Sequence, residues 1–275
     1  MARSADVYGR TDELDGPTLQ AIARRLEARG AHPRYQRMIG DYLDRIDLDG
    51  VQQALDLGCG TGVAARTLAR RRHFAGRVLG IDLSPALVER ARALAGAELP
   101  EERVQFEAGD ARALALPDAS FDVIIAHTLL SHVADPLAVV REAARLVRPG
   151  GRIVLCDGDY ASLSFVTEAE DGGEGTDRML REALVTNPRV MRTVPRLLAG
   201  LDMPLECSFA YVVSDIGRAD FFAAALDSFR VLLPRSGVLE EARAAAYVDA
   251  LEAASARGVF FASSNFYTFI ARRPA

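Results

Sequence analysis

The stretch Asp56-Leu57-Gly58-Cys59-Gly60-Thr61-Gly62 decides the fold that this sequence predicts. It follows an apolar run over 51–57, which is typical of a buried strand, and it precedes a helical pattern over 64–72. Glycines at such a junction let the backbone approach a ligand closely. The helix that follows presents free N–H groups and the positive end of its dipole. The stretch therefore predicts a nucleotide-binding loop.

The spacing of the glycines and the acid beside them narrow the ligand. Gly58, Gly60 and Gly62 form a G-x-G-x-G pattern, whereas the dinucleotide fingerprint would need a glycine where Val63 stands. Asp56 closes the strand, and a carboxylate there is a poor neighbour for a pyrophosphate. It suits a cationic ligand better, such as the ammonium of an amino acid moiety.

Two further acids follow the next strands of the pattern. Asp82 ends the strand 77–81, where it is placed to accept hydrogen bonds from both hydroxyls of a ribose. Asp110 follows the strand 104–107, where its carboxylate can meet an exocyclic amine such as that of adenine. Each acid has an alternative role, capping a helix or a turn. Together they converge on the edge where open α/β sheets bind ligands.

The rest of the chain continues an alternation of strands and helices up to residue 157. Strands are expected at 121–126 and 152–156, with a helix over 136–147 between them. This order predicts an α/β fold with a parallel sheet covered on both faces. Beyond 157 we expect an acidic loop or lid edge at 168–177, followed by segments listed in chain order: helices around 176–200, a strand at 206–213, helices near 217–230 and 238–256, and a strand near 265–272.

The composition excludes several classes of function. All 33 basic residues are arginine, so a Schiff-base lysine, a pyridoxal-phosphate enzyme and a P-loop lysine are excluded. A net charge of −5 gives no bulk attraction to nucleic acid or to an anionic membrane. The three cysteines stand far apart, which indicates reduced thiols and no zinc site. Without a signal peptide or a membrane span in the sequence, we expect a soluble cytoplasmic protein.

The sequence resembles the class I S-adenosylmethionine (SAM)-dependent methyltransferases, and within them the UbiE/type-11 small-molecule branch. The resemblance covers roughly residues 35–157. It rests on six segments: Leu55-Asp-Leu-Gly-Cys-Gly-Thr-Gly62, Gly80-Ile-Asp-Leu-Ser84, Phe106-Glu-Ala-Gly-Asp-Ala111, Leu116-Pro-Asp-Ala-Ser-Phe-Asp122, Ser131-His-Val-Ala-Asp-Pro136 and Leu146-Val-Arg-Pro-Gly-Gly151.

The resemblance implies a Rossmann-like, mostly parallel sheet of seven strands whose last two form an antiparallel pair. It also implies SAM as cofactor and S-adenosyl-L-homocysteine (SAH) as product. The loop Asp56–Gly62 would hold the methionine part, Asp82 the ribose, and Asp110 with Ala111 the adenine. The cofactor-binding residues expected on these grounds are Asp56, Gly58, Cys59, Gly60, Gly62, Asp82, Leu83, Asp110, Ala111, His127, Tyr35 and Arg37.

Methyl transfer needs a general base only if the acceptor must lose a proton. His127 follows the fourth strand and is the catalytic candidate, although contact with the cofactor is favoured over base catalysis. His132 is the second candidate for a general base, although a packing role is favoured for it over catalysis. Arg37 is a candidate for the SAM carboxylate, or for a solvated pair with Asp41. Pocket walls are expected from Tyr8, Tyr35, Tyr160, Met191, Phe260 and Phe261, each of which also fits ordinary core packing.

The sequence divides into an N-terminal helical cap (1–50), a SAM-binding core (51–157), a helical lid insertion (158–205), and strands and helices that complete the same sheet (206–275). The function predicted is methyl transfer to an O, N or C centre of a small molecule, without metal, nucleic acid or membrane. A homodimer is left open. The alternatives are a non-catalytic SAM-binding protein and, less favoured, an NAD(P)-dependent oxidoreductase.

Overall fold

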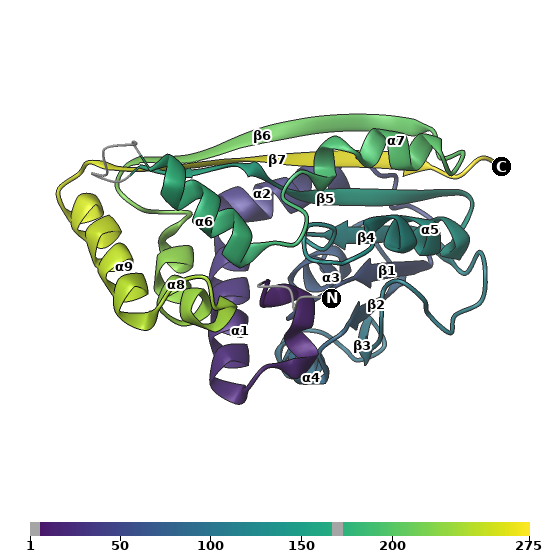
Figure 1. The fold of residues 1–275 in the computed structure, drawn as a ribbon. Coiled ribbons are helices and arrows are strands. Elements are labelled where there is room, and N and C mark those ends of the chain that lie inside the picture. The colour runs from purple at the N-terminus through teal and green to yellow at the C-terminus, as the bar shows by residue number, and fades with distance from the viewer. Residues whose placement is uncertain (1–5, 167–172) are drawn as a thin grey trace.

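A computed structural model describes residues 6–166 and 173–275 of the chain. Seven strands form one sheet in the order β3-β2-β1-β4-β5-β7-β6 (Figure 1). The first five in this order are parallel, and β7 runs antiparallel to both β5 and β6. The strands are β1 (Gln53–Leu57), β2 (Arg77–Asp82), β3 (Val104–Ala108), β4 (Phe121–His127), β5 (Val147–Phe165), β6 (Leu205–Gly217) and β7 (Phe260–Arg272). The predicted seven-stranded Rossmann-like sheet with a terminal antiparallel pair is confirmed.

Helices precede, connect and follow these strands. The helices are η1 (Tyr8–Glu13), α1 (Gly16–Ala31), α2 (Pro33–Leu43), α3 (Val63–Ala69), α4 (Pro85–Gly96), α5 (Pro136–Leu146), α6 (Glu174–Leu184), η2 (Val190–Arg192), α7 (Val194–Ala199), α8 (Ala223–Ser236) and α9 (Glu241–Ala256). Several of them begin with a side-chain cap and a proline in the first turn. At α4 the Ser84 hydroxyl accepts a hydrogen bond from the Leu87 amide, and proline occupies the first helical position.

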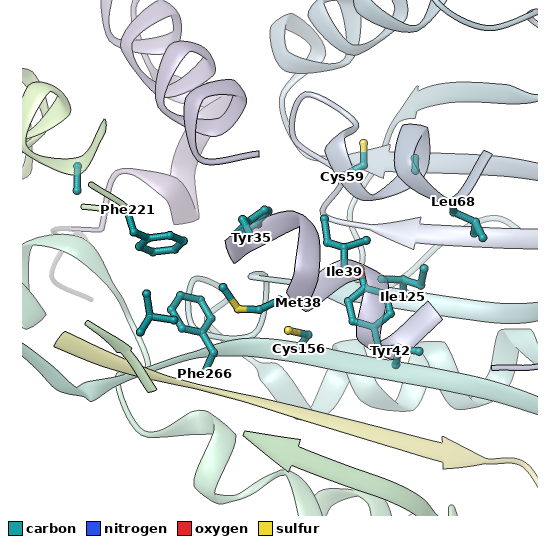
Figure 2. Packing of buried hydrophobic residues seen from close by; sticks show 14 of the residues in the cluster. Tyr35, Met38, Ile39, Tyr42, Cys59, Leu68, Ile125, Cys156, Phe221 and Phe266 are labelled. Atoms are coloured by element: carbon teal, nitrogen blue, oxygen red, sulfur yellow. The ribbon is translucent and has the colours of Figure 1, made fainter. Parts of the chain in front are cut away.

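The two faces of the central strands are covered by different helices. Successive side chains of a strand point to opposite faces, so Ala54 packs in one hydrophobic cluster and Leu55 in the other. On the first face, Met38, Ile39 and Tyr42 of α2 pack against Ile125 of β4 and its neighbours (Figure 2). Because both faces are buried, the strands read as continuous apolar runs in the sequence.

The opposite face is covered by α5 and α7. Val139, Val140 and Leu146 of α5 are fully buried against this face of the sheet, and Leu198 of α7 joins the same cluster. The apolar positions of α5 recur at helical spacing, which turns one side of the helix toward the sheet. The two covered faces leave the ends of the strands as the edges of the sheet that can carry a site.

Three long strands carry a second group of helices beyond this core. β5 extends to Phe165, and after a bulge between Asp159 and Ser164 it pairs again with β7. Helices α6, α8 and α9 lie beside this extension (Figure 1), where Phe165 packs with phenylalanines of α8 and β7. The predicted helical lid insertion is therefore wrong for 158–165, which is strand. Of the predicted acidic loop 168–177, residues 168–172 lie outside the described residues, and α6 begins at Glu174.

Candidate functional site

A cavity of about 180 Å³ lies at the carboxyl ends of the parallel strands. The glycine loop and the residues that follow β2, β3 and β4 form its floor, and α1 and η1 cover it. Its lining includes Tyr8, Gly9, Arg25, Leu26, Arg29, Tyr35, Asp56, Gly58, Cys59, Gly60, Thr61, Asp82, Leu83, Asp110, Ala111, Arg112, His127, Thr128, Leu129, His132 and Tyr160. Most of the cofactor-binding residues predicted from the sequence therefore line this one cavity.

The glycines of the loop make room for its neighbours as well as for a ligand. Gly58 and Gly60 both have left-handed backbones, with φ of 68° and 54°, which favour glycine over residues with a side chain. A Cβ atom on Gly58 would lie 2.6 Å from a methyl carbon of Leu129, and one on Gly60 would lie 3.0 Å from Leu26. The loop is thus pressed between the chain after β4 and helix α1.

Gly62, the third glycine of the pattern, does not line the cavity. Its φ is 82°, and a Cβ there would lie 2.5 Å from the ring of Phe106 on β3. The same ring lies 2.4 Å from the position of a Cβ on Gly80. The structure therefore gives Gly62 a different role from the predicted cofactor contact, since its missing side chain lets α3 approach the sheet over Phe106.

Asp56 is the next-to-last residue of β1, just before the glycine loop, and 1% of its surface is exposed. Its carboxylate accepts a hydrogen bond of 3.1 Å from the Ala65 amide in the first turn of α3. Burial raises the pKa of Asp56 to about 7; the Ala65 hydrogen bond opposes this shift and the nearby Asp82 adds to it. A cation in the cavity would favour the ionised form of this carboxyl.

Asp82 links the end of β2 to the glycine loop. Its Oδ2 accepts from the Gly60 amide at 2.8 Å, and its Oδ1 accepts from the Ser84 amide at 3.0 Å. Burial raises the pKa of this carboxyl, and the two amide bonds oppose that shift. Carboxylate oxygens can accept further hydrogen bonds, so a hydroxyl-bearing ligand in the cavity can share them.

Asp110 lies on the cavity rim, with its carboxylate held by the side chain of Arg112. The Arg112 guanidinium donates to Oδ2 at 2.6 Å, and this hydrogen bond lowers the pKa of Asp110. Ala111 and Leu83 also line the cavity on this side, and Leu83 is exposed. The rim therefore combines two apolar side chains with an ionised carboxylate, which fits a flat ring bearing an amine.

His127 ends β4 and is buried between three side chains. Its Nδ1 lies 3.1 Å from the Tyr42 hydroxyl, its Nε2 lies 3.9 Å from the Cys156 sulfur, and its ring packs against Tyr35 at 4.8 Å between centroids. Burial lowers the pKa of His127 to about 3, and the positive charge of Arg29 adds to the shift. A neutral imidazole with both nitrogens beside protein groups is a poor proton acceptor. The geometry argues against the predicted catalytic role and leaves His127 as a wall residue.

The two candidates from the N-terminal helices have different positions. Tyr35 is buried and lines the cavity, whereas Arg37 is exposed and does not. One residue step on an α-helix turns the side chain by about 100°, so the face that carries Tyr35 and Met38 to the core turns Arg37 away. Three arginines line the cavity: Arg25, Arg29 and Arg112. The guanidinium of Arg29, on α1, lies 4.8 Å from the Tyr35 ring and donates to the Thr128 hydroxyl at 3.2 Å.

Several polar atoms of the wall are buried without a hydrogen-bond partner in the described part of the chain. They are Oη of Tyr8, Nε of Arg29 and Oγ1 of Thr61. Buried polar groups are nearly always hydrogen-bonded in folded proteins, so these atoms indicate contacts with a polar ligand. The carboxylates of Asp56 and Asp82 can face a cation and hydroxyl groups, and the guanidinium of Arg29 can face a carboxylate. The rim at Asp110 can hold a ring that bears an amine. SAM carries all of these groups.

Sequence reasoning missed one pair on the wall. His132 Nδ1 lies 3.0 Å from the carboxylate of Asp6, and the Tyr8 and Tyr160 rings flank the imidazole. Tyr8 and Tyr160 line the cavity as expected, but Met191 and Phe260 are core residues, and Phe261 lies on β7 away from the cavity. No local signal links Asp6 to His132, because they lie in separate segments of the chain.

Comparison with known proteins supports this assignment. Residues 55–155 match the family model of a methyltransferase domain. The chain is 33% identical over 276 residues to an uncharacterized 37.1 kDa protein in transposon TN4556 of Streptomyces fradiae, a match that covers 98% of this chain and 75% of that protein. It is 39% identical over 142 residues to a ubiquinone biosynthesis O-methyltransferase of Xanthomonas oryzae pv. oryzae. That second match spans 51% of this chain and 56% of the relative.

Solved structures share the fold. Phosphoethanolamine N-methyltransferase 2 of Haemonchus contortus, in complex with phosphomonomethylethanolamine and SAH, superposes with a TM-score of 0.62 at 17% identity. The superposition covers 100% of this chain and 61% of that one. S-adenosyl-L-methionine is the cofactor that the matched family indicates. From its motifs, its sheet and these matches, the chain belongs to the class I SAM-dependent methyltransferases.

Proposed function

We propose that this chain transfers the methyl group of SAM to a small-molecule acceptor. The single observation that carries the proposal is a set of three carboxylates, Asp56, Asp82 and Asp110. They stand at or just beyond the carboxyl ends of three adjacent parallel strands and line one cavity with the glycine loop. In this proposal Asp56 faces the ammonium, Asp82 the ribose hydroxyls, and Asp110 with Ala111 the adenine. SAM supplies an electrophilic methyl group on a sulfonium sulfur.

Arg29 takes the role that the sequence analysis gave to Arg37. Its guanidinium is on the cavity wall near the end of β4, and its Nε has no partner among the described residues. A carboxylate is the group that a guanidinium binds with two parallel hydrogen bonds. We therefore place the SAM carboxylate at Arg29, with the Thr61 hydroxyl as a further donor from the glycine loop.

The remaining work of the protein is positioning and the exclusion of water. In-line displacement at a methyl group gains most from a fixed distance and direction between the reacting atoms. Leu26 of α1 and Leu129 after β4 close over the loop, and the buried Tyr35 and His127 form a wall that gives no proton acceptor. His127 is buried and uncharged, so it adds neither a charge nor a water-binding surface to this wall.

A small acceptor fits the covered cavity better than a macromolecule. The cavity measures about 180 Å³ and lies under α1 and η1. The residues at 6–166 and 173–275 contain no helix long and apolar enough to cross a membrane, and no group of three or more side chains arranged to hold a metal. Cytoplasmic location and a homodimer stay predictions.

Calorimetry and a labelled-methyl assay test the proposal. We expect SAM and SAH to bind with Kd values in the micromolar range or below, and Asp82→Ala to lose most of that affinity. Incubation with SAM carrying a deuterated methyl group should give a mass-shifted product from a panel of small hydroxyl, amine and carbon acceptors. NADH binding in place of SAH would favour the oxidoreductase. SAH binding without product from any acceptor would favour a non-catalytic SAM-binding protein.

A further inference from the structure

An ionisable pair on the cavity wall has no part in the cofactor site described above. Nδ1 of His132 lies 3.0 Å from Oδ2 of Asp6. The Asp6 side chain is fully buried, whereas the His132 side chain keeps 10% of its surface exposed and lines the cavity. Docking of the N-terminal segment on the chain after β4 brings the pair together. At this contact a Cβ on Gly9 would lie 2.5 Å from the carbonyl oxygen of His132.

The Asp6 carboxylate is fixed by donors on several sides. Its Oδ1 accepts from the Tyr8 amide at 2.9 Å, and its Oδ2 accepts from the amide and the hydroxyl of Thr186 at 3.0 and 3.1 Å. A carboxylate held in this way orients a neutral histidine, because it accepts a hydrogen bond only from the ring nitrogen that bears the proton. Nδ1 of His132 therefore carries the hydrogen, and Nε2 keeps its lone pair.

His132 lines the cavity beside a group that suits a hydroxyl ligand. Among the described residues, the hydrogen bonds of the His132 ring are those of Nδ1 to Asp6. The flanking ring of Tyr8, 4.9 Å away between centroids, has a buried hydroxyl that lacks a partner in the same described part of the chain. A hydroxyl compound between these two groups would satisfy both, as donor to the imidazole and as partner of the tyrosine.

An apolar recess lies next to the cavity and shares three of its lining residues. This second cavity measures about 40 Å³, and the shared residues are Arg25, Arg29 and Tyr160. Five phenylalanines contribute to its wall: Phe165, Phe221, Phe222, Phe229 and Phe266. Such a wall binds apolar surface without a compensating polar contact. An acceptor that places its hydroxyl at His132 can place an alkyl or aromatic part of itself in this recess.

We propose that His132, positioned by Asp6, is the general base that removes the proton of a hydroxyl on an apolar small molecule, which makes this chain an O-methyltransferase. The inference rests on the proposed function and names its acceptor class. The hydroxyl oxygen bonds to the methyl carbon as its proton passes to Nε2, and the electron pair of the broken S–C bond stays on sulfur. The imidazolium is stabilised by Asp6 until its proton leaves to solvent.

Charged and titratable groups surround His132 on the packed elements. Asp6 and the buried Asp157, which accepts from the amide and hydroxyl of Ser131, favour the imidazolium by their negative charge. Arg25 and Arg29 on the wall oppose it, and the rings of Tyr8 and Tyr160 flank the imidazole. Asp6 is the group in direct contact, so its contribution outweighs that of charges farther away.

The first test reads the proton on His132 without any turnover. Nitrogen NMR of the histidine rings in the SAH complex reports which ring nitrogen is protonated, and His132→Gln identifies the signal among the four histidines. We expect the Nδ1–H form in the wild type and a mixture of the two neutral forms in Asp6→Asn. An Nε2–H form in the wild type would overturn the proposal.

The second test uses 4-nitrophenol, whose phenolate has a visible absorption band that the phenol lacks. At a fixed pH at which free 4-nitrophenol is mostly protonated, the wild-type SAH complex should raise the bound phenolate-to-phenol ratio about tenfold over His132→Gln, which corresponds to one pKa unit. Asp6→Asn should lie between them. His73→Gln is the control, since His73 lies 3.8 Å from Asp49 in a pair exposed at the surface.

Calorimetry with SAH separates the two proposals. If His132→Gln binds SAH like the wild type and has lost the phenolate signal, the base assignment holds. Equal phenolate ratios in the wild type and His132→Gln would overturn it, and so would failure of 4-nitrophenol to bind the wild-type SAH complex. If the wild type itself fails to bind SAH, the proposed function falls.

Discussion

Both oxygens of the Asp82 carboxylate already accept a backbone amide, from Gly60 and from Ser84. In Asp82→Asn the side-chain amide nitrogen takes the place of one carboxylate oxygen, so one of these two backbone N–H groups loses its acceptor. The ribose hydroxyls also lose a charged acceptor. We expect the Kd for SAH to rise about ten- to hundredfold, the equivalent of one charge-assisted hydrogen bond. Isothermal titration calorimetry measures this change.

Asp122 provides the matched control for that substitution. It also accepts two backbone amides, those of Gln52 and Gln53 at 2.9 Å, but it lies at the start of β4, at the edge of the sheet away from the cavity. Asp122→Asn should lower stability and leave the SAH affinity unchanged. Equal losses of affinity in both variants would mean that the effect of Asp82 is structural.

Asp56 makes cofactor binding dependent on pH. Because burial raises its pKa to about 7, this carboxyl is largely protonated at pH 6 in the free protein. An ammonium beside it favours the ionised form, so binding releases a proton, and affinity for SAH should rise with pH and level off above about 7. Calorimetry in buffers of different ionisation enthalpy counts the released proton. Proton release that persists in Asp56→Asn would contradict this assignment.

At the scale of elements, β2, β3 and α3 meet over one ring. Phe106 of β3 fills the space left by the absent side chains of Gly62 and Gly80. Gly62→Ala should lower the free energy of unfolding by about 3 kcal/mol, since a left-handed alanine costs about 1–2 kcal/mol and a steric clash about 1–3 kcal/mol. Chemical denaturation measures this. Phe106→Leu in the same chain should recover about 1 kcal/mol relative to additivity, and strict additivity would show that the ring is not the obstacle.

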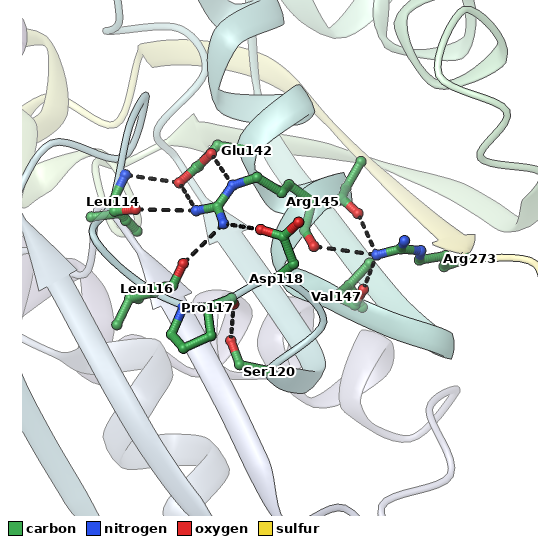
Figure 3. Close-up of polar contacts among 10 residues, drawn as sticks. Leu114, Leu116, Pro117, Asp118, Ser120, Glu142, Arg145, Val147 and Arg273 are labelled. Atoms are coloured by element: carbon green, nitrogen blue, oxygen red, sulfur yellow. Dashed lines mark hydrogen bonds and ion pairs between the residues drawn. The ribbon is translucent and has the colours of Figure 1, made fainter.

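The segment between β3 and β4 is tied to α5 by Arg145. Its guanidinium donates to Glu142, Asp118 and the carbonyl oxygens of Leu114 and Leu116 (Figure 3). Glu142 in turn accepts from the Leu114 amide at 2.8 Å. The half-exposed position screens these charges, but the two carbonyls lose their donor if the side chain is removed.

We therefore expect Arg145→Ala to lower the free energy of unfolding by about 2 kcal/mol. Hydrogen exchange over 112–118 should also become faster, because this segment loses its tie to the helix. Arg141→Ala is the matched control on the exposed side of the same helix, with an expected change within about 0.5 kcal/mol. Equal changes in the two variants would contradict the role of the network.

At the scale of the whole molecule, His127 and Asp56 make the pH dependence of stability the sum of two opposing slopes. Burial lowers the pKa of His127 to about 3, so the unfolded chain binds a proton below about 6.5 that the folded chain does not. Stability from this residue falls as the pH falls through that window. Asp56 acts the other way: the folded chain keeps a proton up to about 7, so its stability contribution falls as the pH rises from about 4.

The two slopes nearly cancel between about pH 4 and 6.5, and single variants should reveal them. Relative to the wild type, the free energy of unfolding of Asp56→Asn should fall toward acid by about 1.4 kcal/mol per pH unit, and that of His127→Gln should rise by a similar amount. Urea denaturation across the window measures both. Comparison between variants removes the shared contribution of carboxyls whose pKa is lowered, such as Asp122 and Glu142. Parallel curves would contradict the prediction.

The places where the structure departs from the sequence-based expectations share a physical cause. Arg37 and Arg29 are both on N-terminal helices, and only the docking of α1 over the glycine loop decides that Arg29 reaches the cavity. Gly62 fits the family motif, but the group that it contacts is the ring of Phe106, which lies 44 residues later in the sequence. The extension of β5 to Phe165 depends on pairing with β7, which local periodicity does not encode.

The sequence by itself determined the sheet, its glycine loop and the meeting of Asp56, Asp82 and Asp110. Strand periodicity is local, and the carboxyl ends of adjacent parallel strands necessarily share an edge. Only the tertiary structure decided which arginine faces the cavity, that both nitrogens of His127 lie beside protein groups, and that Asp6 holds His132. These outcomes depend on the docking of α1 and the N-terminal segment over the sheet edge, because packing between distant segments fixes side-chain positions that no spacing along the chain specifies.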